Sequence, residues 1–167
     1  MPRRKPTTAS AADATPAADP REQWLQLDRQ LCFALYSSSL AMTKLYKPLL
    51  APLGLTYPQY LAMLVLWESD GLAVGQLGQR LSLDSGTLTP LLKRLETLGH
   101  IERRRARDDE RRVDIFLTPA GRKLRRQALD IPGQLACASA CDLHELALLT
   151  QRLHELRSQL TAATEAA

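Results

Sequence analysis

The stretch VGQLGQRLSLDSGTLTPLLKRLETLGH, residues 74–100, decides the fold. Leu77 and Leu81 are spaced as on one face of a short helix, and polar residues after them supply a turn. A second helix is predicted to follow, with Asp84 or Ser85 as its N-cap. Its core face carries leucines at helical spacing, namely Leu88, Leu91, Leu92, Leu95 and Leu98. The stretch therefore predicts two helices joined by a tight turn.

The two ends of this second helix differ in how well the sequence defines them. Gly99 is expected to end it, because glycine suits the left-handed backbone that closes many helices. Pro90 lies several residues inside the cap, so the helix either begins later, near Thr87, or is bent at the proline. Both alternatives remain open from the sequence.

Two short strand candidates follow the helix pair, over residues 101–107 and 113–117. Apolar and polar residues alternate in the second, which suits a ribbon with one buried face. A polar tip over residues 108–112 joins the two strands. Thr118 is then expected to cap another helix, with Pro119 at its first position. This pattern predicts a β-hairpin wing beside the helix pair.

Helical patterns also precede the helix pair. The first begins at Trp24 and is expected to run to residue 46 or 47, where Pro48 breaks it. Thr56 is the expected N-cap of the next helix, and Gln59 completes a capping box with it.

The sequence after the wing predicts one further long helix. The helix capped by Thr118 is expected to end around residues 131–133, and Asp142 with Glu145 opens the last helix. The last helix carries a heptad seam made of Leu146, Leu149, Leu153, Leu156 and Leu160. Such a stripe commonly faces a chain's own core. A domain this small has little core left for two long terminal helices, so we expect both to form a dimer interface.

The predicted fold is mainly α with a small β wing, a winged helix-turn-helix whose N- and C-terminal helices form a dimerisation region. Residues 1–20 are expected to be a disordered tail, and residues 21–167 one winged-helix domain. Within that domain we expect the DNA-binding part at about 56–120 and dimerisation helices at about 21–48 and 119–164.

Basic residues are concentrated in one segment. The chain of 167 residues carries a formal net charge of +4, yet residues 93–126 hold twelve Lys/Arg against six Asp/Glu. A solvated charged face is the usual explanation of a charge run. Because this excess coincides with a helix-turn-helix pattern, binding to nucleic-acid phosphates is the better interpretation.

Other classes of protein are disfavoured. Three cysteines without paired spacing, with no helical histidine pair near them, indicate neither a disulfide framework nor a metal site, and no cofactor is predicted. No apolar run approaches the length of a membrane span, and the N-terminus lacks the apolar stretch of a secretory signal. A cytoplasmic location without membrane association is the resulting expectation.

The DNA-binding residues are predicted from the geometry of the motif, which places the second helix in the major groove and the wing tip against the minor groove. The polar groups on the outer face of that helix are Ser85, Thr87, Thr89 and Lys93. At the wing, Arg111 or Arg112 is expected to enter a narrow minor groove, with Asp109 orienting the Arg111 guanidinium.

At this point the chain resembles the MarR family of bacterial regulators, over roughly residues 27–160. The most specific part is RDDERRVDIFLTPAG, residues 107–121, which is similar to the family's wing signature. The resemblance implies a dimer that binds a pseudo-palindromic operator in double-stranded DNA through winged helices, with both chain ends at the subunit interface.

All four tyrosines of the chain fall within residues 36–60. Cys32 and Tyr36 are four residues apart and share a helix face. Tyr46 lies about 21 Å further along a straight helix, so only a two-fold partner could bring it near Cys32. Tyr57 begins the next helix, where it could pack on the first. Phenols near a thiolate favour its charged form, although a buried cysteine beside interfacial tyrosines is the plainer explanation.

A cysteine near the start of the first helix, with tyrosines 4, 14 and 25 residues later, resembles the organic-hydroperoxide-sensing branch of the MarR family. The string DSGTLTPLLKRLE, residues 84–96, is also similar to that branch. The resemblance implies that Cys32 is the sensing thiol and that Tyr36, Tyr46 and Tyr57 bond it. In two-cysteine members a resolving thiol lies where Cys137 stands, with Cys141 as the rival.

The sequence hypothesis is a repressor, not an enzyme, whose Cys32 is oxidised by an organic hydroperoxide and then joined to Cys137 of the partner subunit, which releases the operator. One alternative is a MarR-type repressor released by a non-covalent ligand such as a phenolic compound. Another is a thiol peroxidase, which would have no use for a winged helix or a basic segment.

Overall fold

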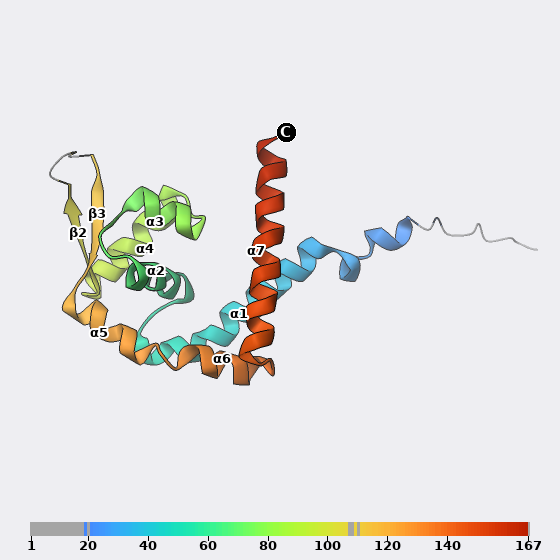
Figure 1. Ribbon diagram of the computed structural model, residues 1–167, viewed down its shortest axis with the longest axis horizontal. Coiled ribbons are helices and arrows are strands. Elements are labelled where there is room, and N and C mark those ends of the chain that lie inside the picture. Colours follow the sequence, from blue (N-terminus) through green and yellow to red (C-terminus); the bar gives the residue numbers. More distant parts are fainter. Residues whose placement is uncertain (1–18, 20, 107–108, 110, 167) are drawn as a thin grey trace, which may run out of the picture. The chain divides into compact units, whose positions relative to one another are not determined.

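The computed structural model describes residue 19, residues 21–106, residue 109 and residues 111–166 (Figure 1). Most of the expected N-terminal tail and part of the wing tip lie outside these residues. The chain divides into two compact units, Met1–Leu40 and Ala41–Ala167.

The described part of the first unit holds two 3₁₀ turns, Glu22–Leu25 and Leu27–Arg29, and the beginning of helix α1, Leu31–Leu50. The first helix therefore begins seven residues later than predicted, because the backbone is extended at Gln26 and Gln30. Trp24 is 63% exposed and Leu25 83% exposed, so the described residues provide little packing to hold this apolar stretch as a continuous helix.

The expected end of the first helix at Pro48 is also wrong, because Pro48 lies inside α1. It stands two residues before the last residue of the helix. A proline there removes only the hydrogen bond to the carbonyl one turn earlier, near an end where few bonds remain to be lost.

The second unit contains the winged helix. Its elements, after the end of α1 and a 3₁₀ turn at Ala51–Leu53, are α2 (Tyr57–Glu68), β1 (Leu72–Ala73), α3 (Val74–Leu81), α4 (Ser85–Thr97), β2 (Ile101–Arg105), β3 (Val113–Leu117), α5 (Pro119–Gln127), α6 (Ile131–Ser139) and α7 (Leu143–Glu165). The fold is mainly helical with a small antiparallel wing, as the sequence predicts.

The sheet has the strand order β1-β3-β2, and both pairings are antiparallel. Ile101 lies opposite Leu117, and Arg103 lies opposite Ile115. The strand β1 was not predicted, because two residues are too few to show an alternating pattern. The hairpin strands end at Arg105 and begin again at Val113, close to the predicted positions.

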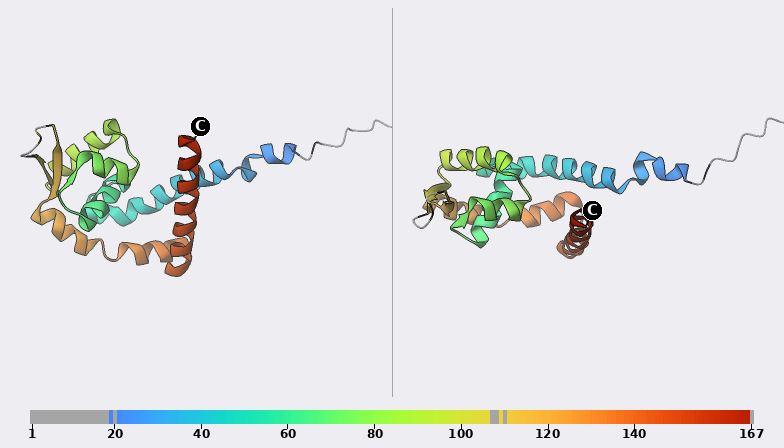
Figure 2. Two further views of the ribbon diagram at one scale, coloured as in Figure 1. Left: turned by 45° about the horizontal axis from the view of Figure 1, so that its top comes forward. Right: turned by 90° about the horizontal axis from the view of Figure 1, so that it is seen from above.

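Helices α2, α3 and α4 pack against one another, as Figures 1 and 2 show from three directions. The turn between α3 and α4 is tight, because a side chain at Gly78 would lie 2.9 Å from the carbonyl oxygen of Leu83. Helix α4 begins at Ser85 with Asp84 as its N-cap, so the later start near Thr87 is wrong and Pro90 lies inside the helix. The largest fully buried side chains are Leu50, Met63, Leu66, Leu77, Leu88, Leu92, Leu95, Ile101 and Ile115.

Hydrogen bonds join α2 and the base of the wing to the start of α5. The indole N–H of Trp67 donates to the carbonyl oxygen of Gly121 at 2.9 Å. The hydroxyl of Thr118 accepts from the Gly121 N–H at 3.0 Å and donates to the Gly99 carbonyl at 2.6 Å, so the predicted cap of α5 is confirmed. A side chain on Gly121 would lie 2.0 Å from the His100 carbonyl oxygen, which makes this the closest backbone approach among the glycines described.

Between the wing and α7 the chain forms two helices, α5 and α6, where one was predicted. Helix α5 ends at Gln127, and α6 begins at Ile131 with a proline in its first turn. Pro132 begins a helix here, a position where its missing N–H costs nothing. The predicted capping box of the last helix is confirmed, since Asp142 accepts from the Glu145 N–H at 2.8 Å.

In the part of the chain that the structure describes, no helix by itself has the length and apolar character of a membrane span, and residues 31–53 meet those criteria only when combined with α2.

Candidate DNA-binding face and cysteine site

The outer face of α4 presents the polar residues that the sequence singles out. Ser85, Thr87, Thr89 and Lys93 are all exposed, while Leu88 and Leu92 on the other side of the same helix are buried. Ser85, Thr87 and Thr89 thus lie exposed in the first turns of the helix, and Lys93 lies exposed about one turn beyond Thr89.

Two of these hydroxyls are already engaged within the helix. Thr87 Oγ1 donates to the Asp84 carboxylate at 2.9 Å, and Thr89 Oγ1 donates to the Ser85 carbonyl at 2.7 Å. The bonds from Thr87 hold the pKa of Asp84 below its usual value. Each hydroxyl oxygen still has room to accept a bond, so Thr87 and Thr89 are suited to donors such as base amino groups.

At the described part of the wing tip, the Asp109 carboxylate accepts the backbone N–H of Arg111 at 2.9 Å. The Asp109 carbonyl accepts the backbone N–H of Arg112 at 2.9 Å. The Asp109 side chain therefore accepts a hydrogen bond from the main chain of Arg111. From the sequence, we expected it to contact the guanidinium of Arg111 instead. Asp109 fixes the turn from which both arginines project. The Arg112 Nε also lies 3.2 Å from the Asp114 carboxylate.

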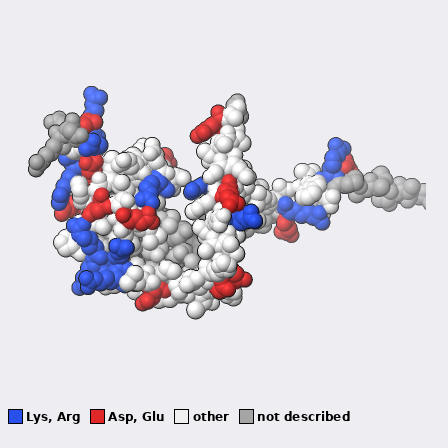
Figure 3. Space-filling view, in the orientation of Figure 1, with Lys and Arg blue, Asp and Glu red and all other residues white. Residues whose placement is uncertain are grey.

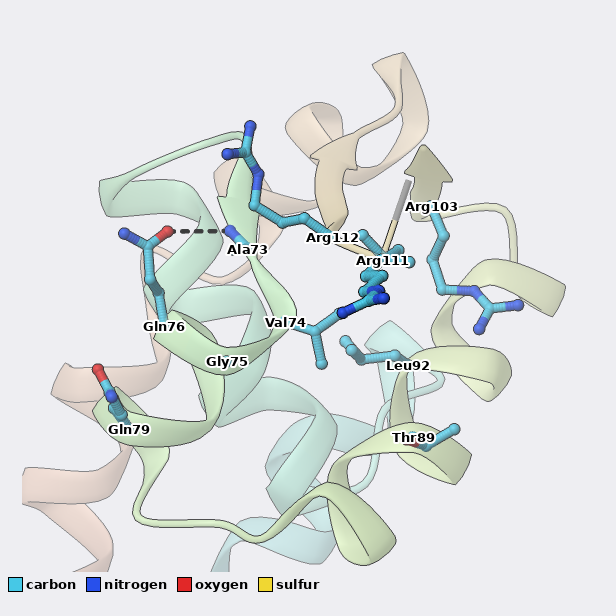
Figure 4. Close-up of a pocket in the computed structure, with 11 residues that line it drawn as sticks. Ala73, Val74, Gly75, Gln76, Gln79, Thr89, Leu92, Arg103, Arg111 and Arg112 are labelled. Atoms are coloured by element: carbon cyan, nitrogen blue, oxygen red, sulfur yellow. Dashed lines mark hydrogen bonds between the residues drawn. The ribbon is translucent and has the colours of Figure 1, made fainter. Parts of the chain in front are cut away.

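A cavity of about 660 Å³ lies between the wing and the helix pair (Figure 4). Arg103, Arg111 and Arg112 reach it from the wing, Gln76 and Gln79 from α3, and Thr89 and Leu92 from α4. The Gln76 side chain accepts the Ala73 N–H at 3.0 Å, which ties β1 to the start of α3. This cavity could not be predicted from sequence, because its lining comes from α3 with the strand before it, from α4 and from the wing. Arginines at a hollow favour an anion such as phosphate, although two of these three have acidic partners, Arg103 with Glu96 and Arg112 with Asp114.

The predicted sensor residues lie in both compact units. Cys32 and Tyr36 are exposed and stand one turn apart on α1, in the first unit. Tyr46 and Tyr57 belong to the second unit, where their rings stack with 4.7 Å between centroids and 30° between planes. Two of the three predicted tyrosines are therefore brought together within one unit.

Tyr60 joins this cluster, with its ring centroid 5.7 Å from that of Tyr46, and was not predicted. It is buried in the apolar face of α2, so its sequence position resembled any core residue. Burial, with a smaller effect of the neighbouring phenols, raises the pKa of Tyr46 to about 12. Burial also raises the pKa of Tyr57, so both phenols remain hydrogen-bond donors at neutral pH.

Cys137 and Cys141 have different environments. Cys137 is exposed on α6 and lines an open hollow of about 630 Å³ with Leu49, Leu129 and Gln134. Cys141 is half-buried beyond the end of α6, and its Sγ lies 3.5 Å from the Ser139 carbonyl oxygen. The two cysteines do not share one helix face, because α6 ends at Ser139 and Ala140 has a left-handed backbone.

The helix-turn-helix, the wing and the basic cavity define a winged-helix transcriptional regulator. A family model described as "Transcriptional regulator SarA/Rot" matches residues 44–127. The organic hydroperoxide resistance transcriptional regulator of Bacillus subtilis (strain 168) is 51% identical over 136 residues, which is 81% of this chain and 92% of that protein.

Two solved structures are also similar. Reduced AbfR bound to DNA is 33% identical, with a TM-score of 0.69 over 84% of this chain and 99% of that one. The disulfide form of AbfR is 34% identical, with a TM-score of 0.56 over 81% of this chain and 96% of that one; another AbfR structure names Staphylococcus epidermidis as its source.

This chain belongs to the MarR family of transcriptional regulators, and its resemblance to the hydroperoxide-sensing branch is confirmed by the Bacillus relative. These relatives are regulators and not enzymes, which excludes the thiol peroxidase alternative.

Proposed function

We propose that the protein is a homodimeric repressor that releases a pseudo-palindromic operator when an organic hydroperoxide oxidises Cys32. The observation that carries this proposal is the exposed Cys32 thiol, one turn before Tyr36, in a chain 51% identical to an organic hydroperoxide resistance regulator. A thiol that senses a solute must be accessible, and an adjacent phenol can donate a hydrogen bond to its thiolate.

The chemistry runs in two balanced steps. The Cys32 thiolate attacks the distal peroxide oxygen, so that an S–O bond forms while the O–O bond breaks and the leaving alkoxide takes a proton to become an alcohol. Cys32 is then a sulfenic acid. The partner subunit's Cys137 attacks that sulfur, and the hydroxyl leaves as water with the thiol proton. The two thiols lose two electrons, and the peroxide gains them.

Tyr36, Tyr46 and Tyr57 are proposed to bond the Cys32 thiolate. The raised pKa of Tyr46 and of Tyr57 supports donation, because a phenol must keep its proton to donate. Their rings are stacked with 4.7 Å between centroids, so the two phenols belong to one cluster. We assign the Tyr46–Tyr57 pair to the partner subunit's Cys32, because Tyr46 lies fourteen residues along α1 from the Cys32 of its own chain.

Cys137 is the better resolving thiol of the two candidates. It is exposed beside an open hollow, so a second subunit can reach it. Cys141 is half-buried and contacts the backbone at the α6–α7 turn, which must open before its sulfur becomes accessible. Because a disulfide requires Cα atoms within about 7 Å, the helices that carry both thiols must approach or move on oxidation.

A homodimer is supported by the surface of α7. This helix of 23 residues buries none of its side chains in the single chain. Leu149 is 56% exposed, Leu153 40% and Leu160 54%, all on the predicted heptad seam. Apolar patches of this kind are rarely left open to water, and a second copy of the seam would cover them.

The operator is proposed to lie across the α4 face and the wing tip. Ser85, Thr87, Thr89 and Lys93 would contact the major groove, and Arg111 or Arg112, held by the Asp109 turn, the minor groove. An intersubunit disulfide would shift the spacing of the two winged units. A shift from 1:99 to 99:1 between two arrangements requires about 5.5 kcal/mol, which a covalent bond can supply.

The decisive test uses the reduced protein bound to DNA from its own promoter in a mobility-shift assay. Cumene hydroperoxide should release the wild-type protein and leave Cys32→Ser bound. If both proteins behave alike, Cys32 is not the sensor. Release of both by a phenolic acid without oxidation would instead support the non-covalent alternative.

The resolving thiol is tested on non-reducing gels after peroxide treatment. We expect a covalent dimer band for the wild type and for Cys141→Ser, and none for Cys137→Ser. The reverse pattern would assign the role to Cys141.

A further inference from the structure

Helix α5 carries a concentrated basic face. Its nine residues include four cations and no acid, namely Arg122, Lys123, Arg125 and Arg126. At 100° per residue these four lie within an arc of about 160°, while Gly121, Leu124 and Ala128 point the other way and are buried. All four cations are exposed. Figure 3 shows the resulting dense basic surface in the region of α5.

Three of the wing arginines have an acidic partner, whereas only one of the four cations on α5 has. Arg103 pairs with Glu96, Arg104 with Glu102 and Arg112 with Asp114. On α5 only Arg122 has an acidic partner, Asp70. Among the described residues nothing pairs with Lys123, Arg125 or Arg126. Much of the basic excess that the sequence analysis assigned to operator binding therefore lies on α5.

Stabilisation of the helix explains only some of the four cations on α5. Arg125 and Arg126 occupy the last turn, where cations favourably oppose the helix dipole. Lys123 does not, and it stands three residues from Arg126, a spacing at which like charges repel. Arg122 and Arg126 repel at a spacing of four. An anionic partner would relieve this repulsion.

An operator placed as proposed above would not reach this face. Helix α5 follows the end of β3 at Leu117, and the Asp109–Arg112 turn lies beyond the other end of that strand. Five strand residues span about 17 Å. The groove-reading end of α4 begins at Ser85, and its 13 residues extend about 20 Å toward the end that joins β2. Both DNA-facing ends therefore lie far from α5.

We propose that the α5 basic face binds the phosphate backbone of a second DNA duplex, without sequence preference, while α4 and the wing tip hold the first. Exposed, unpaired Lys and Arg side chains on one convex helix face suit regularly spaced phosphates. The regulator would thereby bring two segments of DNA together.

The test uses two random-sequence duplexes of about 30 base pairs, one with a donor fluorophore and one with an acceptor, and the reduced full-length protein. The wild type should produce energy transfer between the duplexes. Lys123→Gln/Arg126→Gln should lose at least about tenfold in apparent affinity for the second duplex, and the salt slope of that step should fall by about 1.8.

The matched control is Lys123→Arg/Arg126→Lys, which keeps both positive charges at the same exposed positions of α5. It should retain energy transfer. If Lys123→Gln/Arg126→Gln also retains it, the α5 face is not the second site, and the two winged units of the dimer account for bridging. If the wild type gives no transfer although each duplex alone binds, this inference fails while the proposed DNA binding stands. Thermal melting of each variant verifies that it is folded.

Discussion

The phenol of Tyr46 stacks on Tyr57 and lies beside Tyr60, in a cluster where burial raises the pKa of all three groups. A phenol is neutral when protonated, so a pKa raised in the folded state stabilises the fold only while the proton is present. That stabilisation is complete below the unfolded value near 10 and is lost as pH rises toward about 12. At neutral pH the cluster consists of uncharged hydrogen-bond donors.

The tyrosine cluster should make the stability of the protein depend on alkaline pH. We expect the free energy of unfolding of the wild type to fall between about pH 9 and pH 11.5, and to fall less in Tyr46→Phe, because one shifted phenol is gone. Urea unfolding at about pH 9 and about pH 11.5 measures this fall for the wild type and for the variant. Part of the fall remains in Tyr46→Phe, because the pKa values of Tyr57 and Tyr60 are also raised by burial. An equal fall in the variant would show that Tyr46 is not buried as described.

Gly121 illustrates a residue that the backbone requires to be small. Because a Cβ there would meet the His100 carbonyl oxygen at 2.0 Å, Gly121→Ala should destabilise the protein by about 3 kcal/mol or more. Gly133→Ala, in α6 with nothing within 4 Å, should be stabilising by about 0.5–1 kcal/mol. Chemical denaturation compares the two, and similar values for both would contradict the close approach.

At the scale of elements, most helix starts could be predicted because their caps are local. Asp84, Thr118 and Asp142 each accept a hydrogen bond from a backbone N–H three residues later, which the sequence pattern states directly. Helix ends and breaks were predicted less well. The α5–α6 break depends on whether a proline ends one helix or begins another, and the late start of α1 depends on the absence of packing around Trp24.

The cap of α5 also joins two elements, since the Thr118 hydroxyl contacts both Gly121 and Gly99. Thr118→Ala should lower the free energy of unfolding by about 1 kcal/mol. Thr118→Ser keeps the hydroxyl and should recover most of this loss. Denaturation midpoints compare the two variants. If Thr118→Ser is as unstable as Thr118→Ala, the methyl group of Thr118 stabilises the protein and its hydrogen bonds do not.

For the whole molecule, the sequence predicted the winged-helix class, the face of α4 and the leucine seam of α7, because each depends on periodicity or a motif. The cavity between α3, α4 and the wing, the Tyr60 contact and the free basic face of α5 could not be predicted. These features combine residues from several segments, and charge counted along the chain does not reveal which cations are paired in space.

The α7 seam leads to a prediction about assembly. Leu149→Asp should convert the dimer to monomer in sedimentation velocity at micromolar concentration, because a buried carboxylate at the seam has no partner. Ser158→Asp adds the same charge about 180° around the same helix and should leave the dimer intact. A dimer that survives Leu149→Asp would place the interface elsewhere.

The two indoles of the chain stand in contrasting surroundings, since Trp24 is 63% exposed and Trp67 is buried with its N–H bonded to Gly121. Their fluorescence should differ accordingly, with Trp24 emitting at longer wavelength and open to quenching by iodide. A Trp24→Phe protein would therefore emit from Trp67 alone. Peroxide titration of that variant would show optically, without a label, whether strain arising at Cys32 reaches the joint between α2 and α5.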